Sequence, residues 1–149
     1  MVAGGFSAQA ETSFWLLAFS SFIFFSLAIV KRLSELQSIK GSDQEDAVQC
    51  RGYWTSDIPV LTGLGTASAM MAVLVLALYI NSPDVVELYS SPRFLWALCP
   101  VIALWLGRVW LITGRNAMHD DPVVFALRDP TSWLLFALAG AFMVAGAMV

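Results

Sequence analysis

The feature of this sequence that most constrains its fold is a set of four apolar stretches, each long enough to cross a lipid bilayer. They cover residues 14–30, 58–80, 94–113 and 132–149. A transmembrane helix needs about 20 predominantly apolar residues, with a working range of about 17–25. The four stretches therefore predict an all-α, polytopic integral membrane protein, in which residues 1–149 form a single transmembrane domain.

The composition excludes a water-soluble globular domain. The chain has 149 residues, of which 58% are hydrophobic and 13% charged, and its mean hydropathy is +0.73. Soluble domains are about 45–50% apolar and about 25% charged. The net charge is −3 and the basic residues form no surface stripe, so a nucleic-acid partner is not expected. Two cysteines, Cys50 and Cys99, are too few for a disulfide framework.

The distribution of Lys and Arg predicts which side of the membrane each connection faces, because cytoplasmic loops carry an excess of these residues. One side collects Lys31, Arg32, Lys40, Arg51, Arg108, Arg115 and Arg128. The loop at residues 81–93 carries only Arg93. We therefore expect the polar loop 31–57 to be cytoplasmic. Both termini are then expected on the periplasmic side of a bacterial inner membrane.

Basic residues near this cytoplasmic side are candidates for binding an anionic head group or a diphosphate, since Arg and Lys form charge-assisted hydrogen bonds to phosphate. The candidates are the basic residues Lys31, Arg32, Arg51 and Arg108, together with the hydroxyl of Tyr53. Snorkelling of the long side chains to lipid head groups is the alternative explanation for Lys31 and Arg32. Arg108 interrupts the third apolar stretch, so it either snorkels or faces protein, water or a partner charge.

Acidic residues on the same side are candidate Mg²⁺ ligands. Glu35 comes four residues after Lys31 and three after Arg32, so it shares their helix face and can pair with either. A carboxylate among basic residues at a membrane surface also suits Mg²⁺, which binds one or two carboxylates together with substrate phosphates. The candidate ligands are Glu35, Asp57, Asp120 and Asp121.

Several of the acidic residues have a second interpretation as helix caps. Asp57 comes two residues before a proline, and Asp121 and Asp129 each directly precede one. An Asp before a Pro in the first helical turn is an ordinary helix start, so capping is the alternative to metal binding. The apolar residues 123–127 predict a short interfacial helix before the last span.

Small residues cluster in the second and fourth stretches. They are Gly63, Gly65, Ala67, Ser68 and Ala69 in the second, and Ala137, Ala139, Gly140, Ala141, Ala145, Gly146 and Ala147 in the fourth. Faces of small residues allow membrane helices to approach closely, within one chain or against a partner.

Six short strings, spread over most of the chain, carry a family resemblance. They are FWLLAFS (14–20), SLAIVKR (26–32) followed by Glu35, RGY (51–53) followed by Asp57, LALYINSP (76–83), RVWL (108–111) and MHDDPVVFALRD (118–129). Together they resemble the UbiA superfamily of membrane prenyltransferases. The resemblance is strongest to the branch often fused to a haloacid-dehalogenase-like phosphatase domain.

This resemblance implies a larger fold than four helices. Members of the superfamily have nine transmembrane helices around a central cavity, and two acidic motifs on cytoplasmic loops bind a prenyl diphosphate through Mg²⁺ so that an acceptor is alkylated. This chain resembles the last four helices. Residues 31–57 occupy the place of the second motif, whereas the Asn-Asp-x-x-Asp pattern of the first does not occur in the chain. The resemblance therefore implies half of an active site.

Half a set of ligands does not clamp a diphosphate leaving group from several sides, so we expect no catalysis by this chain alone and assign it no catalytic residue or cofactor. The expected function is a non-catalytic transmembrane subunit of a larger membrane assembly, such as a quinone-using photosynthetic or respiratory complex. Its expected partners are other membrane subunits and lipids, including a quinone or polyprenyl lipid. One alternative is half of a split polyprenyl-diphosphate transferase, which needs Mg²⁺ and its missing half. The other is a lipid or quinone binder that acts alone.

Overall fold

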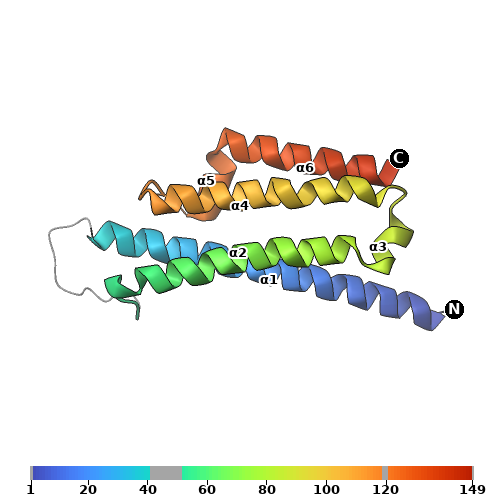
Figure 1. Cartoon of the computed structure of the whole chain (residues 1–149), viewed down its shortest axis with the longest axis horizontal. Coiled ribbons are helices and arrows are strands. Elements are labelled where there is room, and N and C mark those ends of the chain that lie inside the picture. Colours follow the sequence, from blue (N-terminus) through green and yellow to red (C-terminus); the bar gives the residue numbers. More distant parts are fainter. Residues whose placement is uncertain (1, 41–51, 119–120, 149) are drawn as a thin grey trace.

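A computed structural model of the chain describes residues 2–40, 52–118 and 121–148, and the described residues are arranged as helices and turns (Figure 1). The four long helices are α1 (Val2–Lys40), α2 (Ile58–Ile80), α4 (Leu98–Gly114) and α6 (Pro130–Met148). The short elements are the 3₁₀ turns η1 (Thr55–Asp57) and η2 (Pro92–Ala97) and the helices α3 (Pro83–Leu88) and α5 (Pro122–Arg128). Successive long helices run in opposite directions, so the start of α1 and the end of α6 lie at the same end of the bundle (Figure 1).

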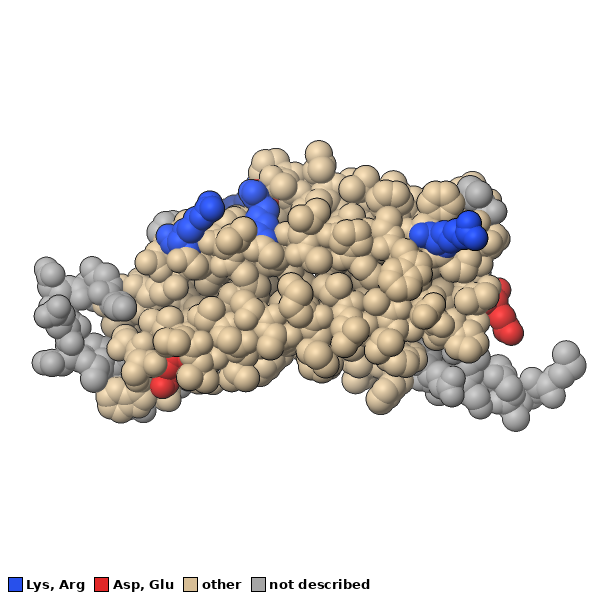
Figure 2. All heavy atoms as spheres, in the orientation of Figure 1, with Lys and Arg blue, Asp and Glu red and all other residues tan. Residues whose placement is uncertain are grey.

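The prediction of four helices long and apolar enough to cross a membrane is confirmed. The candidate spans are Phe14–Ile39, Thr55–Ile80, Pro92–Gly114 and Pro130–Met148. On the face shown in Figure 2, the charged side chains lie toward the two ends of the bundle, and the surface between them is uncharged. This distribution fits a multi-pass membrane protein, because charged side chains are costly at the depth of the acyl chains.

The predicted start of the first polar loop, at residue 31, is wrong. Helix α1 continues to Lys40, ten residues beyond the predicted end of the first span. The reason is apolar packing beyond the membrane-length segment: Leu33 and Leu36 are buried in a cluster with Ile29 and Leu61. The spacing of residues 29, 33 and 36 places them on one helix face, so this face of α1 stays against α2.

The two other connections also contain helix. The predicted short helix over residues 123–127 is confirmed as α5 (Pro122–Arg128). The connection at 81–93, predicted as a short acidic loop, contains α3, and the turn η2 that leads into α4 begins at Pro92. Both α3 and α5 begin with a proline, whose fixed φ favours the first helical position.

The centre of the bundle is a junction of α1, α2 and α4. The hydroxyl of Ser26 donates to the carbonyl oxygen of Gly65 at 2.8 Å and accepts a hydrogen bond from the indole N–H of Trp110 at 3.0 Å. Ser68 donates to the carbonyl oxygen of Phe22 at 2.8 Å, so a second hydroxyl also joins α1 to α2. These bonds connect three helices through two buried hydroxyl groups.

Some of the small residues of the second span are buried against other helices, and others are exposed. Gly65, Ser68 and Ala69 are buried against neighbouring helices, whereas Gly63 and Ala67 are exposed. A Cβ atom added to Gly65 would overlap the ring of Trp110 and would lie 3.0 Å from Ile29 Cγ2. Gly65 is therefore the position at which the absence of a side chain lets α4 approach α2.

Most of the small residues of the fourth span face outward. Of those in α6, Gly146 is buried against Ser91 and Leu95, while Ala137, Gly140 and Ala141 are exposed. The close approach of Gly146 is accompanied by a hydrogen bond from the Ser91 N–H to its carbonyl oxygen at 3.4 Å. Within the described chain, the small face of α6 is thus only partly used for packing.

The Gly65→Ala variant should be destabilised by about 1–3 kcal/mol, the usual cost of forcing extra atoms into a packed interior. Gly63→Ala is the matched control, because an added Cβ there meets nothing within 4 Å. The control should be neutral or slightly stabilised, since Ala is a better helix former than Gly by about 1 kcal/mol. Thermal unfolding of the purified protein in detergent measures both changes. Equal stability of the two variants would contradict the close packing of Trp110 on Gly65.

Candidate functional site

The end of the bundle near α5 and the N-terminus of α2 holds those predicted site residues that the structure describes. There carboxylates meet basic side chains. Three ion pairs form in the described residues: Lys31 Nζ–Asp121 Oδ2 at 2.7 Å, Arg32 Nη1–Glu35 Oε2 at 2.8 Å and Arg108 Nη2–Asp129 Oδ1 at 3.0 Å. The first joins α1 to the start of α5, the second lies within α1, and the third joins α4 to the start of α6. Each pair brings a predicted head-group candidate against a carboxylate of the same chain.

Glu35 pairs with Arg32, one of the two basic neighbours that its spacing allows, and both side chains are partly buried. Glu35 also borders a cavity of about 320 Å³ between the end of α1 and the turn after α4. Its other lining residues are Ser34, Gln37, Ser38, Asn116 and Met118. Asn116 forms this turn with φ of 55°, in the left-handed region that Asn tolerates better than most residues. The cavity is therefore polar on the α1 side and has a single carboxylate among its lining residues.

Asp121 acts as the cap of α5, which confirms the capping interpretation for this residue. Its side chain accepts a hydrogen bond from the backbone N–H of Val123 at 3.1 Å, and Lys31 donates to its other oxygen. The hydrogen bond from Lys31, followed by that from Val123, holds the pKa of Asp121 below its ordinary value. The carboxylate thus remains charged and links the C-terminal part of α1 to α5.

Asp57 does not cap α2 with its side chain, so that interpretation is wrong. It occupies the N-cap position, yet its carboxylate accepts a hydrogen bond from the backbone N–H of Trp54 at 2.9 Å. The physical reason is that Asp57 is the last residue of η1 and has helical backbone angles, which direct its side chain back over that turn. Tyr53 is exposed beside it. Arg51 and Asp120 lie outside the described residues.

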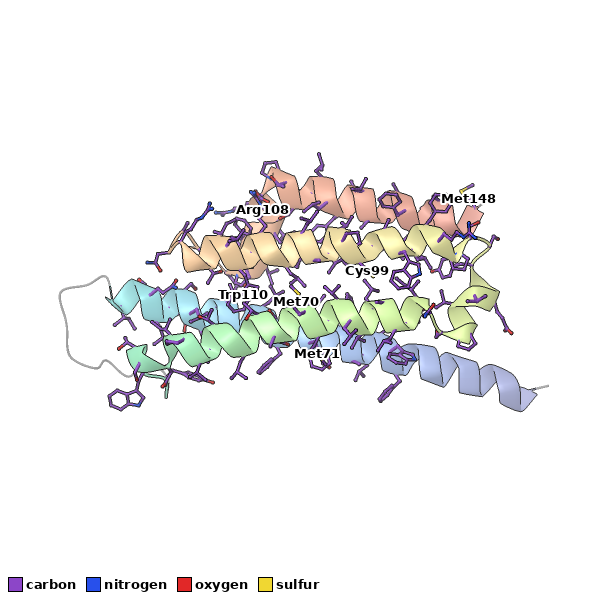
Figure 3. All side chains as sticks on the ribbon, viewed as in Figure 1. Met70, Met71, Cys99, Arg108, Trp110 and Met148 are labelled. Carbon is purple, nitrogen blue, oxygen red and sulfur yellow. The ribbon has the colours of Figure 1, made fainter. Side chains whose placement is uncertain are left out.

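Arg108 has the partner charge that its place in a span requires. Asp129 holds the end of the Arg108 side chain and also accepts hydrogen bonds from the backbone N–H and the hydroxyl of Ser132, each at 2.9 Å. The Ser132 hydroxyl in turn accepts from the indole N–H of Trp105 at 3.1 Å. This chain of four side chains joins α4 to the first turn of α6, at the point where Figure 3 places Arg108.

The environment of Asp129 favours its charged form on balance. Its side chain is only 9% exposed, and this burial raises the pKa. The hydrogen bonds from Arg108 and Ser132 outweigh burial and bring the pKa of Asp129 below its ordinary value. Asp129 was expected only as a possible helix start. Its bond to the Ser132 N–H confirms that cap, whereas its pairing with Arg108 was not predicted.

The predicted metal ligands are not brought together in the part of the chain that the structure describes. Within residues 2–40, 52–118 and 121–148, no group of three His, Cys, Asp or Glu side chains is placed to hold a metal ion. Glu35, Asp57 and Asp121 instead bind an arginine, a backbone N–H and a lysine, respectively. These three carboxylates therefore serve contacts within the helix bundle.

Comparison with known proteins finds two similar chains, both considerably longer. An uncharacterized protein named y4nM from Sinorhizobium fredii is 41% identical over 133 residues, which are 88% of this chain and 26% of that protein. The nodulation protein NoeC from Azorhizobium caulinodans is 31% identical over 133 residues, 89% of this chain and 43% of that protein. This chain thus spans less than half the length of these relatives. No family model matches it, and no solved structure is similar to it.

Removal of the charge at Asp129 should destabilise the bundle. Asp129→Asn keeps a good helix cap but loses the pair with Arg108, and we expect a loss of about 1.5–3 kcal/mol at neutral pH, the range for hydrogen bonds to charged groups. Because the folded-state pKa of Asp129 is lowered, its stabilisation is present above the unfolded pKa of about 3.9 and is lost as pH falls through the folded value. The difference between wild type and variant should therefore narrow in acid.

The measurement is thermal unfolding in detergent between neutral and acid pH. Arg93→Gln, which removes an exposed arginine at the opposite end of the bundle, is the control and should unfold like the wild type. A double variant, Arg108→Gln with Asp129→Asn, should lose less than the sum of the single losses, since the two residues act as a pair. Strict additivity would show that the ion pair contributes nothing.

Proposed function

We propose that this chain is a non-catalytic, UbiA-like transmembrane subunit of a larger membrane assembly. Two findings support the membrane part: four helices have the length and composition of spans, and the charged groups lie toward the ends of the bundle. The sequence strings described above support the UbiA-like part. The proposal assigns to this chain a role in packing and lipid contact, with other membrane proteins as its partners.

The non-catalytic assignment rests on one observation: the candidate metal-binding carboxylates already bind groups of this chain. A prenyl diphosphate is bound through Mg²⁺, which requires carboxylate oxygens that are available to the metal. Glu35 and Asp121 lie at 2.8 Å and 2.7 Å from cationic nitrogens of this chain, and Asp57 accepts from a backbone N–H. Groups held in this way stabilise helix ends and helix contacts, which is the function of a structural subunit.

The outward small residues of α6 are the proposed contact with a partner helix. Ala137, Gly140, Ala141 and Val144 recur at the spacing of one helix face, and all four are exposed. In a membrane, apolar side chains gain little by leaving lipid, so close backbone approach over small residues is what favours helix association. A second transmembrane helix is therefore the occupant that this face suits.

The alternative is half of a split polyprenyl-diphosphate transferase that is active only with its missing half. The length of the relatives favours it, because the matched 133 residues are 26% and 43% of those proteins. Additional helices, in the same polypeptide or another, would then supply the first acidic motif and free Glu35 from Arg32. One relative is named a nodulation protein. We therefore also propose a role in nodulation, which deletion of this chain would test.

Purified chain, supplied with Mg²⁺, a polyprenyl diphosphate and an aromatic acceptor, should give no turnover. The proposal is overturned if the chain alone turns over and Glu35→Ala or Asp57→Ala abolishes the activity, while the control Glu87→Ala, an exposed residue in the 81–93 connection, retains it. Turnover that appears only after addition of a polypeptide with the first acidic motif would establish the split transferase instead.

The partner contact is tested by purification of the tagged chain from its native membrane in mild detergent, followed by mass spectrometry. A membrane protein should copurify with the wild type at a constant molar ratio. The Gly140→Leu variant should lose this partner, because the added side chain prevents close approach of a helix. Leu138→Phe, at an exposed position on another face of α6, is the matched control and should retain the partner. A stable monomer without a copurifying protein would contradict the proposed assembly.

The orientation is also a proposal: the end of the bundle with α5 faces the cytoplasm, and both termini are periplasmic in a bacterial inner membrane. It rests on the excess of Lys and Arg at that end. In a Cys99→Ala background, a membrane-impermeant maleimide should label Cys50 only after the cells are permeabilised. Labelling of Cys50 in intact cells would reverse the orientation, and a cysteine placed at Ser90 is the control for the outer side.

A further inference from the structure

A second concave surface lies away from the ion pairs of α1, on the outside of the bundle. It is a groove of about 710 Å³ between one face of α4 and the first turns of α6. Its walls are mainly apolar, with Leu104 and Leu111 from α4 and Leu135 from α6 among them. Two arginines, Arg108 and Arg115, also line it. A mostly apolar groove with cationic groups toward one end is unusual on the lipid-facing side of a membrane helix and indicates an amphiphilic ligand.

The two arginines line the same side of the groove, Arg108 from within α4 and Arg115 from the position directly after its end. Their separation of seven residues is about two helical turns, so both side chains project toward the same side. Arg108 is 40% exposed although Asp129 binds its Nη2 atom, and a guanidinium has further N–H donors on its other nitrogens. Arg115 follows the last residue of α4 and is exposed, with no ion pair to the described residues. This end of the groove therefore keeps a net positive charge after Asp129 is counted.

The length of the apolar part matches one leaflet of a bilayer. From Arg108 to Pro100, the far lining residue of α4, eight residues of helix span about 12 Å. Half of a bilayer hydrocarbon core is about 15 Å. Leu104 lies between them and is 65% exposed, so the apolar wall is open to a chain that lies along it. An aliphatic chain of one leaflet can thus follow the groove while its head group stays at the level of the arginines.

We propose that this groove binds a single anionic membrane lipid, with its phosphate at Arg108 and Arg115 and one aliphatic chain along the apolar face of α4. Thr131, in the first turn of α6, also lines the groove near the phosphate position. There the N-terminal helix dipole adds to the attraction of an anion. Two kinds of lipid share this chemistry, a glycerophospholipid with an anionic head group and a polyprenyl phosphate. The inference goes beyond the proposed function and does not depend on it, because it needs only the membrane location of α4 and α6.

The test is native mass spectrometry of the purified chain in a neutral detergent, titrated with single lipids. Dioleoyl phosphatidylglycerol should be retained in preference to dioleoyl phosphatidylcholine, which has the same chains and no net charge. Arg115→Gln should weaken phosphatidylglycerol binding about fivefold, the usual contribution of one basic residue near an anionic lipid. It breaks no ion pair of the described structure, so its folding is expected to be normal. Titration with undecaprenyl phosphate identifies which of the two lipid kinds binds more tightly, and tight binding of either supports the proposal.

A second variant tests the apolar part of the groove. Leu104→Trp should fill it and reduce lipid retention, and the wild-type side chain is 65% exposed, so the larger residue does not enter the packed interior. Leu134→Trp, at an exposed position on α6 that does not line the groove, and Arg93→Gln are the matched controls and should bind like the wild type.

Three results would overturn the proposal. The first is equal retention of the two phospholipids. The second is wild-type binding of phosphatidylglycerol by either Arg115→Gln or Leu104→Trp. The third is displacement of the lipid by millimolar inorganic phosphate, which would show a site for a free anion without a contribution from the chain.

Discussion

The arrangement of the bundle depends on the close approach of Trp110 to Gly65. The indole ring of Trp110 lies where any larger residue at position 65 would have its side chain, and the Ser26 hydroxyl binds both the indole N–H and the Gly65 carbonyl. Three helices therefore share one polar junction within an apolar interior. Because hydrophobic burial gives little driving force between helices in lipid, such close packing and hydrogen bonding hold them together.

This junction also fixes the rotation of α4, and with it the position of the charged residues. Arg108 precedes Trp110 by two residues, which is about 200° around the helix axis. When Trp110 points into the junction with α1 and α2, Arg108 must point away from it, toward α6 and the outside of the bundle. Asp129 then meets it at the first turn of α6, and the Ser132 hydroxyl joins the pair to Trp105. The apolar core thus determines where the charges of α4 can lie.

The sequence predicts the positions of the helices well and the side-chain contacts between helices poorly. Span length and composition located all four long helices, and Asp before Pro located the cap of α5, since these signals are local. The extension of α1 to Lys40 was missed because it depends on packing of Leu33 and Leu36 against Leu61 of another helix. The partner of Arg108 was missed for the same reason, as Asp129 is 21 residues away and its role as a cap was the only local signal. At Asp57 the local signal misled, because the preceding turn η1 competes for its carboxylate.

The ion pair with Asp129 lowers the energetic cost of Arg108 in an apolar helix and still leaves its guanidinium accessible. An arginine inside an apolar span is expensive unless a charge or water relieves it, and Asp129 supplies that relief within the chain. Complete burial of the pair would leave nothing for a ligand to contact. The Arg108 side chain is nevertheless 40% exposed, whereas Asp129 is 9% exposed, so the pair presents its cationic partner to the surroundings. Together with Arg115, which directly follows α4, this asymmetry leaves positive charge on the α4–α6 face, while the carboxylate remains inside as the fixed counter-charge.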